Sequence, residues 1–320
     1  MKHDLQPWIE PWIERLRSGD ARALARAIST VENRGPESGE LLKALFPHSG
    51  KARILGLTGA PGAGKSTLVD QLAKYYRRAG KTLGIVAVDP TSPYTGGAIL
   101  GDRIRMQDHH ADPGIYIRSM ATRGSLGGLA RTTADVATVL DASGRDLVLI
   151  ETVGVGQDEV DIVRLADITV VILVPGMGDD VQTIKAGIME IADIFVINKS
   201  DRDGAENVER EVRAMQSLAT RKDGWTPPIV KTVAVDGKGV EELASTIRDY
   251  ENYLQKENLV LKRNIENWRE RLVEMLRDAM LERARAQLGD GQVETFAAEV
   301  AQHKRDPYTL VEEIVRKAGQ

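Results

Sequence analysis

Eight consecutive residues form a candidate phosphate-binding loop. Residues 59–66 read Gly-Ala-Pro-Gly-Ala-Gly-Lys-Ser and match the pattern G-x-x-x-x-G-K-[ST]. Glycines let such a loop turn its backbone N–H groups inward, where the following helix adds positive potential. Lys65 would place a charge at the β- and γ-phosphates, and Ser66 would coordinate magnesium. The residues predicted to contact the phosphates are Gly59, Ala60, Pro61, Gly62, Ala63, Gly64, Lys65, Ser66 and Thr67.

A second candidate for magnesium is the acid that ends another apolar run. Residues 147–150 are followed by Glu151 and, three residues later, by Gly154. P-loop proteins hold magnesium with an acid at the end of a neighbouring strand, usually an Asp, so we expect Glu151 to do this here. In Ras-like proteins a glutamine directly follows the corresponding glycine and orients water. This chain has Val155 there and Gln157 two residues later, which predicts slow hydrolysis by the protein alone.

A third motif predicts which base is bound. Residues 198–201 read Asn-Lys-Ser-Asp and fit the guanine-specifying pattern N-K-x-D. An ionised Asp201 would accept hydrogen bonds from guanine N1–H and the 2-amino group, whereas adenine would leave it unmatched. Unmatched polar groups give discrimination on the order of 10⁴ or more. Asn198 would brace the loop and Lys199 would cover the base. A backbone N–H among Ala234, Val235 and Asp236 would reach guanine O6.

These motifs need a sheet to position them. Short apolar runs alternate with helical segments from residue 53 onward, and several runs are apolar on both faces. Such runs are typical of parallel strands covered on both sides. The predicted fold class is therefore α/β, a doubly wound, mostly parallel P-loop domain. The expected strands span residues 54–58, 82–89, 115–120, 147–152, 169–174, 194–198 and 229–234.

Helical segments flank this domain on both sides. Trp8, Trp12 and Leu16 recur on one helical face, and residues 21–31 predict a second helix. After Val240 the strand signals stop and the chain becomes charged and helical. That segment is either a solvated, partly packed extension or a dimerisation arm. The expected organisation is an N-terminal helical extension at 1–50, a P-loop GTPase domain at 51–240 and a C-terminal helical arm at 241–320.

Composition limits the other functions of the 320-residue chain. A net charge of −4 argues against binding to duplex nucleic acid over the whole surface. The absence of cysteine excludes disulfides and thiolate metal sites. The N-terminus lacks the pattern of a signal peptide, and the longest apolar run, 168–174, is too short to span a bilayer. We expect a cytoplasmic protein with neither nucleic acid nor a membrane as partner.

Several further blocks carry a family resemblance. Residues 89–97 are rich in glycine and proline, which suits a loop that reorders with the γ-phosphate. Together with residues 98–106, 117–124, 151–157 and 176–185 they resemble the MeaB/ArgK family, a branch of the metallochaperone-type P-loop GTPases. The resemblance extends over nearly the whole chain, including residues 306–310.

This resemblance implies a function that the residues alone do not. Members are homodimeric chaperones of adenosylcobalamin-dependent acyl-CoA mutases, chiefly methylmalonyl-CoA mutase, that gate cofactor loading and protect the mutase. It implies hydrolysis of GTP to GDP and phosphate, slow alone and stimulated by the partner. Mg²⁺ would accompany GTP or GDP, and cobalamin would be met only through the partner.

The resemblance also assigns roles by position. It places Lys65, Asp102 and Glu151 in catalysis and adds Asp89 to Ser66, Asp102 and Glu151 around magnesium. Switch residues would be Gly154, Gln157 and, in a third switch at 175–185, Asp179 and Lys185. The lysine that marks the related dimeric ATPases is Ala60 here, which argues against that branch.

Two rival functions remain. A GTPase metallochaperone for another metal would need a cluster of histidines or cysteines, and the adjacent His109 and His110 are expected to lie on the surface. A transport-linked kinase, the second rival, would use ATP, which the N-K-x-D motif opposes. Competition between ATP and GTP would separate the two nucleotides.

Overall fold

The computed structural model describes residues 7–89, 109, 111–121, 128–152, 165–176, 191–218, 221, 223–289 and 291–318. The chain divides into two compact units, residues 1–261 and 262–320. The first unit therefore extends past Val240, where the sequence placed the start of the arm. None of the described helices is long and apolar enough to cross a membrane.

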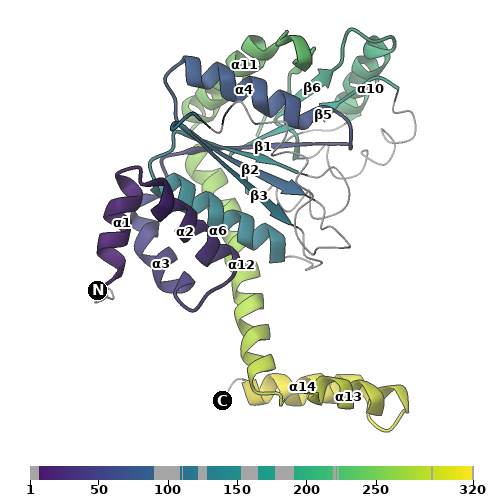
Figure 1. Ribbon diagram of the computed structural model, residues 1–320. Helices are drawn as coiled ribbons and strands as arrows, with labels where there is room; N and C mark the ends of the chain where they lie inside the picture. The colour runs from purple at the N-terminus through teal and green to yellow at the C-terminus, as the bar shows by residue number, and fades with distance from the viewer. Residues whose placement is uncertain are drawn as a thin grey trace. The chain divides into compact units, whose positions relative to one another are not determined.

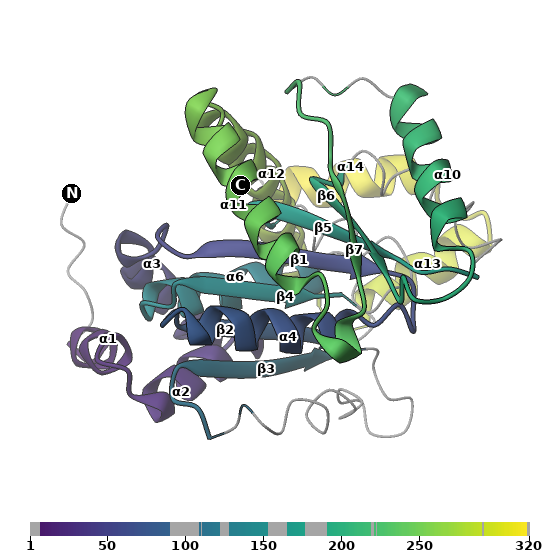
Figure 2. The ribbon, with the colours of Figure 1, turned by 90° about the horizontal axis from the view of Figure 1, so that it is seen from above.

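A seven-stranded sheet forms the centre of the first unit (Figure 2). Its strand order is β3-β2-β4-β1-β5-β6-β7, and every neighbouring pair is parallel. This confirms the predicted α/β fold class. The strands are β1 (Arg53–Gly59), β2 (Leu83–Asp89), β3 (Ile115–Ala121), β4 (Leu147–Glu151), β5 (Ile168–Leu173), β6 (Ile194–Asn198) and β7 (Ile229–Thr232).

The direction of winding reverses at β1. The chain leaves β1 and crosses beyond β4 to form β2, whereas after β4 it crosses to the other side of β1 to form β5. In open α/β sheets, ligands bind at the carboxyl ends of the strands at such a reversal. The predicted phosphate loop begins at the carboxyl end of β1 and therefore lies at this position.

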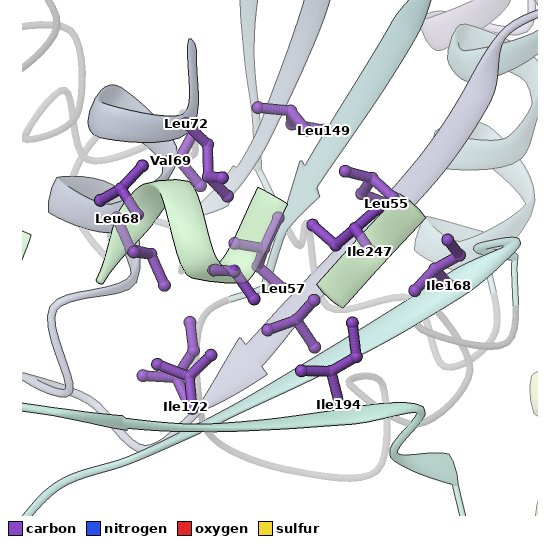
Figure 3. Packing of buried hydrophobic residues seen from close by; sticks show 14 of the residues in the cluster. Leu55, Leu57, Leu68, Val69, Leu72, Leu149, Ile168, Ile172, Ile194 and Ile247 are labelled. Carbon is purple, nitrogen blue, oxygen red and sulfur yellow. The ribbon is translucent and has the colours of Figure 1, made fainter. Parts of the chain in front are cut away.

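One face of the sheet is covered by α4 (Lys65–Arg78) and α11 (Val240–Lys256) (Figure 1). Alternate strand residues such as Leu55 and Leu57 point to this face and are fully buried. Figure 3 shows them packed with Leu68 of α4 and Ile247 of α11. Burying such a side chain contributes about 1.5–3 kcal/mol. This core fixes α4, and with it the loop that precedes α4.

The other face of the sheet holds the N-terminal helices, α1 (Ile9–Arg17), α2 (Ala21–Glu32) and α3 (Ser38–Leu45), together with α6 (Gly128–Ala142) (Figure 1). Their apolar side chains share one buried cluster with Val148 and Ile150 of β4. The segment expected to be an extension is therefore part of the core of the first unit.

Helix α10 (Ala205–Leu218) covers β5 and β6, where Val208 and Val212 bury against Phe195. Helix α11 is held at its far end by an aromatic cluster. Trp225 packs between Tyr250 and Tyr253, with ring centroids 4.7 and 4.9 Å away. Helix α11 thus completes the core of the first unit.

The second unit consists of α12 (Val260–Ala286), which begins at the boundary, α13 (Gln292–Ala301) and α14 (Pro307–Ala318). No residue of α12 is buried. Arg305 joins the last two helices: it lies 5.4 Å from the ring centroid of Phe296 and forms ion pairs with Glu299 and Glu313. These three helices confirm the helical pattern that the sequence shows in this part of the chain.

Candidate functional site

The loop between β1 and α4 depends on glycines at two close approaches. Gly64 has φ +89°, and a Cβ there would collide with Nδ2 of Asn198. Gly59 has φ +151°, and a Cβ there would collide with the carbonyl oxygen of Ile172. Both φ values lie in the range that side-chain-bearing residues avoid. The glycines predicted from the motif are therefore required by the backbone and by its neighbours.

Lys65 lies inside this loop. Its side chain is 6% exposed, and Nζ donates hydrogen bonds to the carbonyl oxygens of Gly59 at 2.7 Å and Ala60 at 3.1 Å. Lys65 also begins α4, whose N-cap, Gly64, provides no side-chain cap. The first-turn N–H groups of a helix lack partners within the helix and attract anions. The loop thus combines backbone donors with a positive charge held in position.

Ser66 and Glu151 meet where α4 begins and β4 ends. Ser66 Oγ donates to Glu151 Oε1 at 2.6 Å, and the two residues are 8% and 4% exposed. Thr152 Oγ1 donates to Thr58 Oγ1 at 3.0 Å and joins the ends of β4 and β1 beside them. A hydroxyl and a carboxylate are the hard oxygen ligands that Mg²⁺ prefers. The chemistry of this donor pair fits the predicted ion.

Asn198 connects the two predicted motifs. Its side chain is 2% exposed, and Nδ2 donates to the carbonyl oxygen of Ala63 in the phosphate loop at 2.8 Å. Oδ1 accepts from Thr232 Oγ1 at 3.0 Å and from the backbone N–H of Ala234 at 3.1 Å. One amide therefore joins the phosphate loop, the end of β6 and the turn after β7.

Lys199 adds a second link between the motifs. Its φ is +55°, unusual for a residue with a side chain, and Nζ donates to the carbonyl oxygen of Gly62 at 2.7 Å. Asp201 is exposed in the turn that follows. Ala234–Asp236 forms a short 3₁₀ helix in which Val235 is 76% exposed. Lys199, like Asn198, therefore contacts the phosphate loop directly.

The chain just before β3 is bound to α4 at two points. His109 is 5% exposed, and its Nε2 lies 2.7 Å from Oδ1 of Asp70 on α4. Asp112 accepts two hydrogen bonds from the guanidinium of Arg77, both at 2.8 Å. The guanidinium of Arg77 and the N–H of Gly114 hold the pKa of Asp112 below its ordinary value. The expectation that His109 lies on the surface is wrong, because its ring is buried and paired with Asp70, a partner that the residues adjacent in sequence do not reveal.

Other predicted positions have no described side chain. Asp89 is the last residue of β2, paired in register with Ala121 of β3, but its side chain is not described. Five further predicted site residues lie outside the described ranges: Asp102, Gly154, Gln157, Asp179 and Lys185.

The site has two further features, one concerning metal ligands and one concerning side-chain pairs. Across the described residues, no group of three or more His, Cys, Asp or Glu side chains could hold a metal ion. The Thr58–Thr152 pair and the Asp70–His109 pair were not predicted from the sequence. The two threonines are 94 residues apart in the sequence, and Asp70 and His109 are 39 residues apart. Neither pair belongs to a motif with fixed spacing.

Comparisons with known proteins agree on one family. A family model described as "Methylmalonyl Co-A mutase-associated GTPase MeaB" matches residues 24–289. GTPase ArgK of Escherichia coli is 39% identical over 76% of this chain and 76% of its own length. The mitochondrial methylmalonic aciduria type A homolog of Mus musculus is 36% identical over 78% of this chain and 64% of its own. A crystal structure of an LAO/AO transport system kinase superposes with a TM-score of 0.71 at 29% identity, covering 98% of both chains.

Proposed function

Because the chain belongs to the MeaB family of P-loop GTPases, we propose that its GTP hydrolysis serves a cobalamin-dependent acyl-CoA mutase, with methylmalonyl-CoA mutase the first candidate. In this proposal the protein gates adenosylcobalamin loading and protects the mutase. The family's description names association with that mutase, which supports the choice of partner. Cobalamin would be met only through the mutase.

The observation that carries the nucleotide part of the proposal is the position of Asn198. Its amide bonds the phosphate loop at Ala63 and the turn at Ala234. A nucleotide whose phosphates lie in the loop would therefore present its base to Asp201 and to the backbone at Ala234–Asp236. Guanine has the donors that Asp201 can accept, which supports GTP over ATP.

The chemistry follows from the residues that surround the phosphates. When bound, Mg²⁺ would neutralise charge on the β- and γ-phosphates, with Ser66 and Glu151 as its ligands and Asp89 and Asp102 as further candidates. Lys65 would stabilise charge on the transferred phosphoryl group, which is how most of the acceleration arises in this chemistry. Asp102 and Glu151 complete the proposed catalytic set. Because Val155 replaces a water-orienting glutamine, we propose slow turnover by the protein alone.

The partner's signal is proposed to act through the switch segments. Gly154 and Gln157 belong to one segment, and Asp179 and Lys185 to another, at positions assigned by the family resemblance. If the mutase prefers one arrangement of these segments, GTP and the mutase must alter each other's binding by the same free energy.

A homodimer is the proposed assembly, and α12 provides the reason. Leu261, Ile265, Trp268, Leu272 and Met275 follow a spacing of four, three, four and three residues, and each is exposed or partly exposed in the single chain. This spacing is typical of a coiled-coil seam, whose apolar side chains need a second helix. We propose that a second copy of α12 covers this seam.

The test is a GTPase assay with and without purified methylmalonyl-CoA mutase. Mutase should accelerate the wild-type protein, and Asp179→Ala/Lys185→Ala should lower the ratio of stimulated to unstimulated rate. An equal ratio would assign the signal to other residues. No acceleration by the mutase would contradict the chaperone role and leave the GTPase role standing.

A transport-linked kinase is the alternative, since one structural relative carries such a name. Competition of ATP and GTP for the wild-type protein separates the two functions. A dissociation constant for ATP as low as that for GTP would favour the kinase.

A further inference from the structure

A cleft of about 430 Å³ lies between α1 and α2, among the N-terminal helices. Its lining includes Trp8, Trp12, Arg15, Arg22 and Arg26. None of the residues that form the phosphate loop or the guanine-recognition loop contributes to it. Its volume falls within the range of about 300–1,000 Å³ that is usual for sites of small ligands.

Helical periodicity brings these side chains together. Trp8, Trp12 and Arg15 follow one another at intervals of four and three residues, and Arg22 and Arg26 are one turn apart on α2. Residues 7–50 contain as many Asp and Glu residues as Lys and Arg residues. Three arginines and a single acid, Glu37, nevertheless line the cleft, so arginines outnumber acids in its lining.

Packing explains some of these side chains. Trp12 is 7% exposed, and its Nε1 donates to the carbonyl oxygen of Ala23 at 3.0 Å, which joins α1 to α2. Arg15 donates twice to Asp20, at 2.9 and 2.7 Å. Arg26 lies 4.7 Å from the ring centroid of Trp12 and 4.0 Å from Glu37.

Packing does not explain Trp8 or Arg22. Trp8 is 36% exposed and contacts Trp12 at a tilt, with ring centroids 5.8 Å apart. Within the described part of the chain, no hydrogen bond or ion pair engages the guanidinium of Arg22. The exposed indole of Trp8 and the nearby guanidinium groups could each bind a different part of a ligand. The indole can stack on a planar ring, and the guanidiniums can bind a phosphate.

We propose that this cleft binds a second nucleotide-type ligand, one with a planar ring and a phosphate. The planar ring stacks on Trp8, and the phosphate lies between Arg22 and Arg26. Arg15 remains bound to Asp20 and does not contact the phosphate. This site would share no residues with the GTP site.

The experiment is isothermal titration calorimetry of the full-length protein saturated with GDP and Mg²⁺, so that the phosphate loop is filled. The probes are AMP, which has both ring and phosphate, adenosine, which has only the ring, and inorganic phosphate. AMP should bind with a dissociation constant below about 1 mM, and the other two at least about tenfold more weakly. Absence of AMP binding at millimolar concentrations would overturn the proposal, as would phosphate binding as tightly as AMP.

Variants of the residues that line the cleft test whether AMP binds there. Arg22→Ala/Arg26→Ala should weaken AMP binding at least about tenfold, whereas Arg17→Ala, an exposed arginine of α1 outside the lining, should not change it. Trp8→Phe should retain binding and Trp8→Ala should lose it, with circular dichroism melting used to check that each variant is folded. Unchanged AMP binding by the double arginine variant would place the ligand elsewhere.

Discussion

Ser66 at the start of α4 and Glu151 at the end of β4 are joined by a hydrogen bond of 2.6 Å between Oγ and Oε1. The two residues are 85 positions apart in the chain and come together because β4 pairs directly with β1, with Leu57 opposite Glu151. The pairing of these two strands therefore aligns a hydroxyl and a carboxylate.

Glu151→Gln should test the role of that carboxylate. A glutamine can still accept the hydrogen bond from Ser66, so the fold should be retained while the negative charge is lost. We expect single-turnover GTP hydrolysis to fall about 10²–10³-fold and to require more Mg²⁺, because a charged ligand of the ion has been removed. Glu241→Gln, on the exposed side of α11, is the control. An unchanged rate at low Mg²⁺ would remove Glu151 from the metal site.

Asp201→Asn should move base preference from guanine toward xanthine. The amide can no longer accept two hydrogen bonds from guanine but can donate to the 2-oxo group of xanthine. GTP affinity should fall by a factor on the order of 10³ or more while xanthosine triphosphate gains, as measured by competition binding. Asp203→Asn, an exposed acid in the same turn, provides the matched control. Comparable losses in both variants would indicate disturbance of the turn instead of lost base recognition.

Asn198→Ala should destabilise the first unit. The substitution leaves the carbonyl oxygen of Ala63 and the N–H of Ala234 without their buried partner. Each such group costs about 1–3 kcal/mol, so the free energy of unfolding should fall by about 2–6 kcal/mol. Urea unfolding followed by circular dichroism measures this, with Asn207→Ala, at an exposed position of α10, as the control. Equal stability of the two variants would mean that Asn198 does not brace the loops.

Acid should weaken the contact between Arg77 and Asp112. The pKa of Asp112 is lowered in the folded protein, chiefly by its hydrogen bonds with Arg77. The resulting stabilisation is complete above the ordinary Asp pKa of about 3.9 and is lost as pH falls through the lower folded-state value. Between pH 5 and pH 2.5, roughly the range around that pKa, the wild type should lose more free energy of unfolding than Asp112→Asn. Asp203→Asn should retain the wild-type slope, and a wild-type slope in Asp112→Asn would contradict the assignment.

Charged residues in the α12 seam should weaken the proposed dimer. Ile265→Asp/Leu272→Asp would place two charges in the seam, and the dissociation constant should rise at least about 100-fold. Light scattering on the full chain measures the change. Leu281→Asp is the control, because Leu281 is 49% exposed and lies on the opposite side of α12 from the seam. A double variant that stayed dimeric would place the interface elsewhere.

The strands and the loop that follows β1 were predictable because their signals are local. Runs such as residues 170–174 are apolar at every position, and the phosphate motif has fixed spacing. The strand order and the partners of each helix depend on contacts between distant residues. Nothing near His109 predicts its pairing with Asp70, and nothing in residues 1–50 predicts their packing against β4. The first unit includes α11, which the expected boundary after residue 240 assigns to the arm. A charged amphipathic helix can cover a sheet or extend from it, so its sequence does not decide between the two.

The fit between Gly64 and Asn198 restricts how this nucleotide site can be re-engineered. Because a side chain at position 64 would collide with the Asn198 amide, the phosphate loop and the base-recognition loop are matched surfaces and not interchangeable modules. A base-recognition segment grafted from another nucleotide-binding protein would have to bring a side chain of the same shape to position 198. Without it, the graft would leave a gap behind the phosphate loop, and triphosphate affinity would fall even for the intended base.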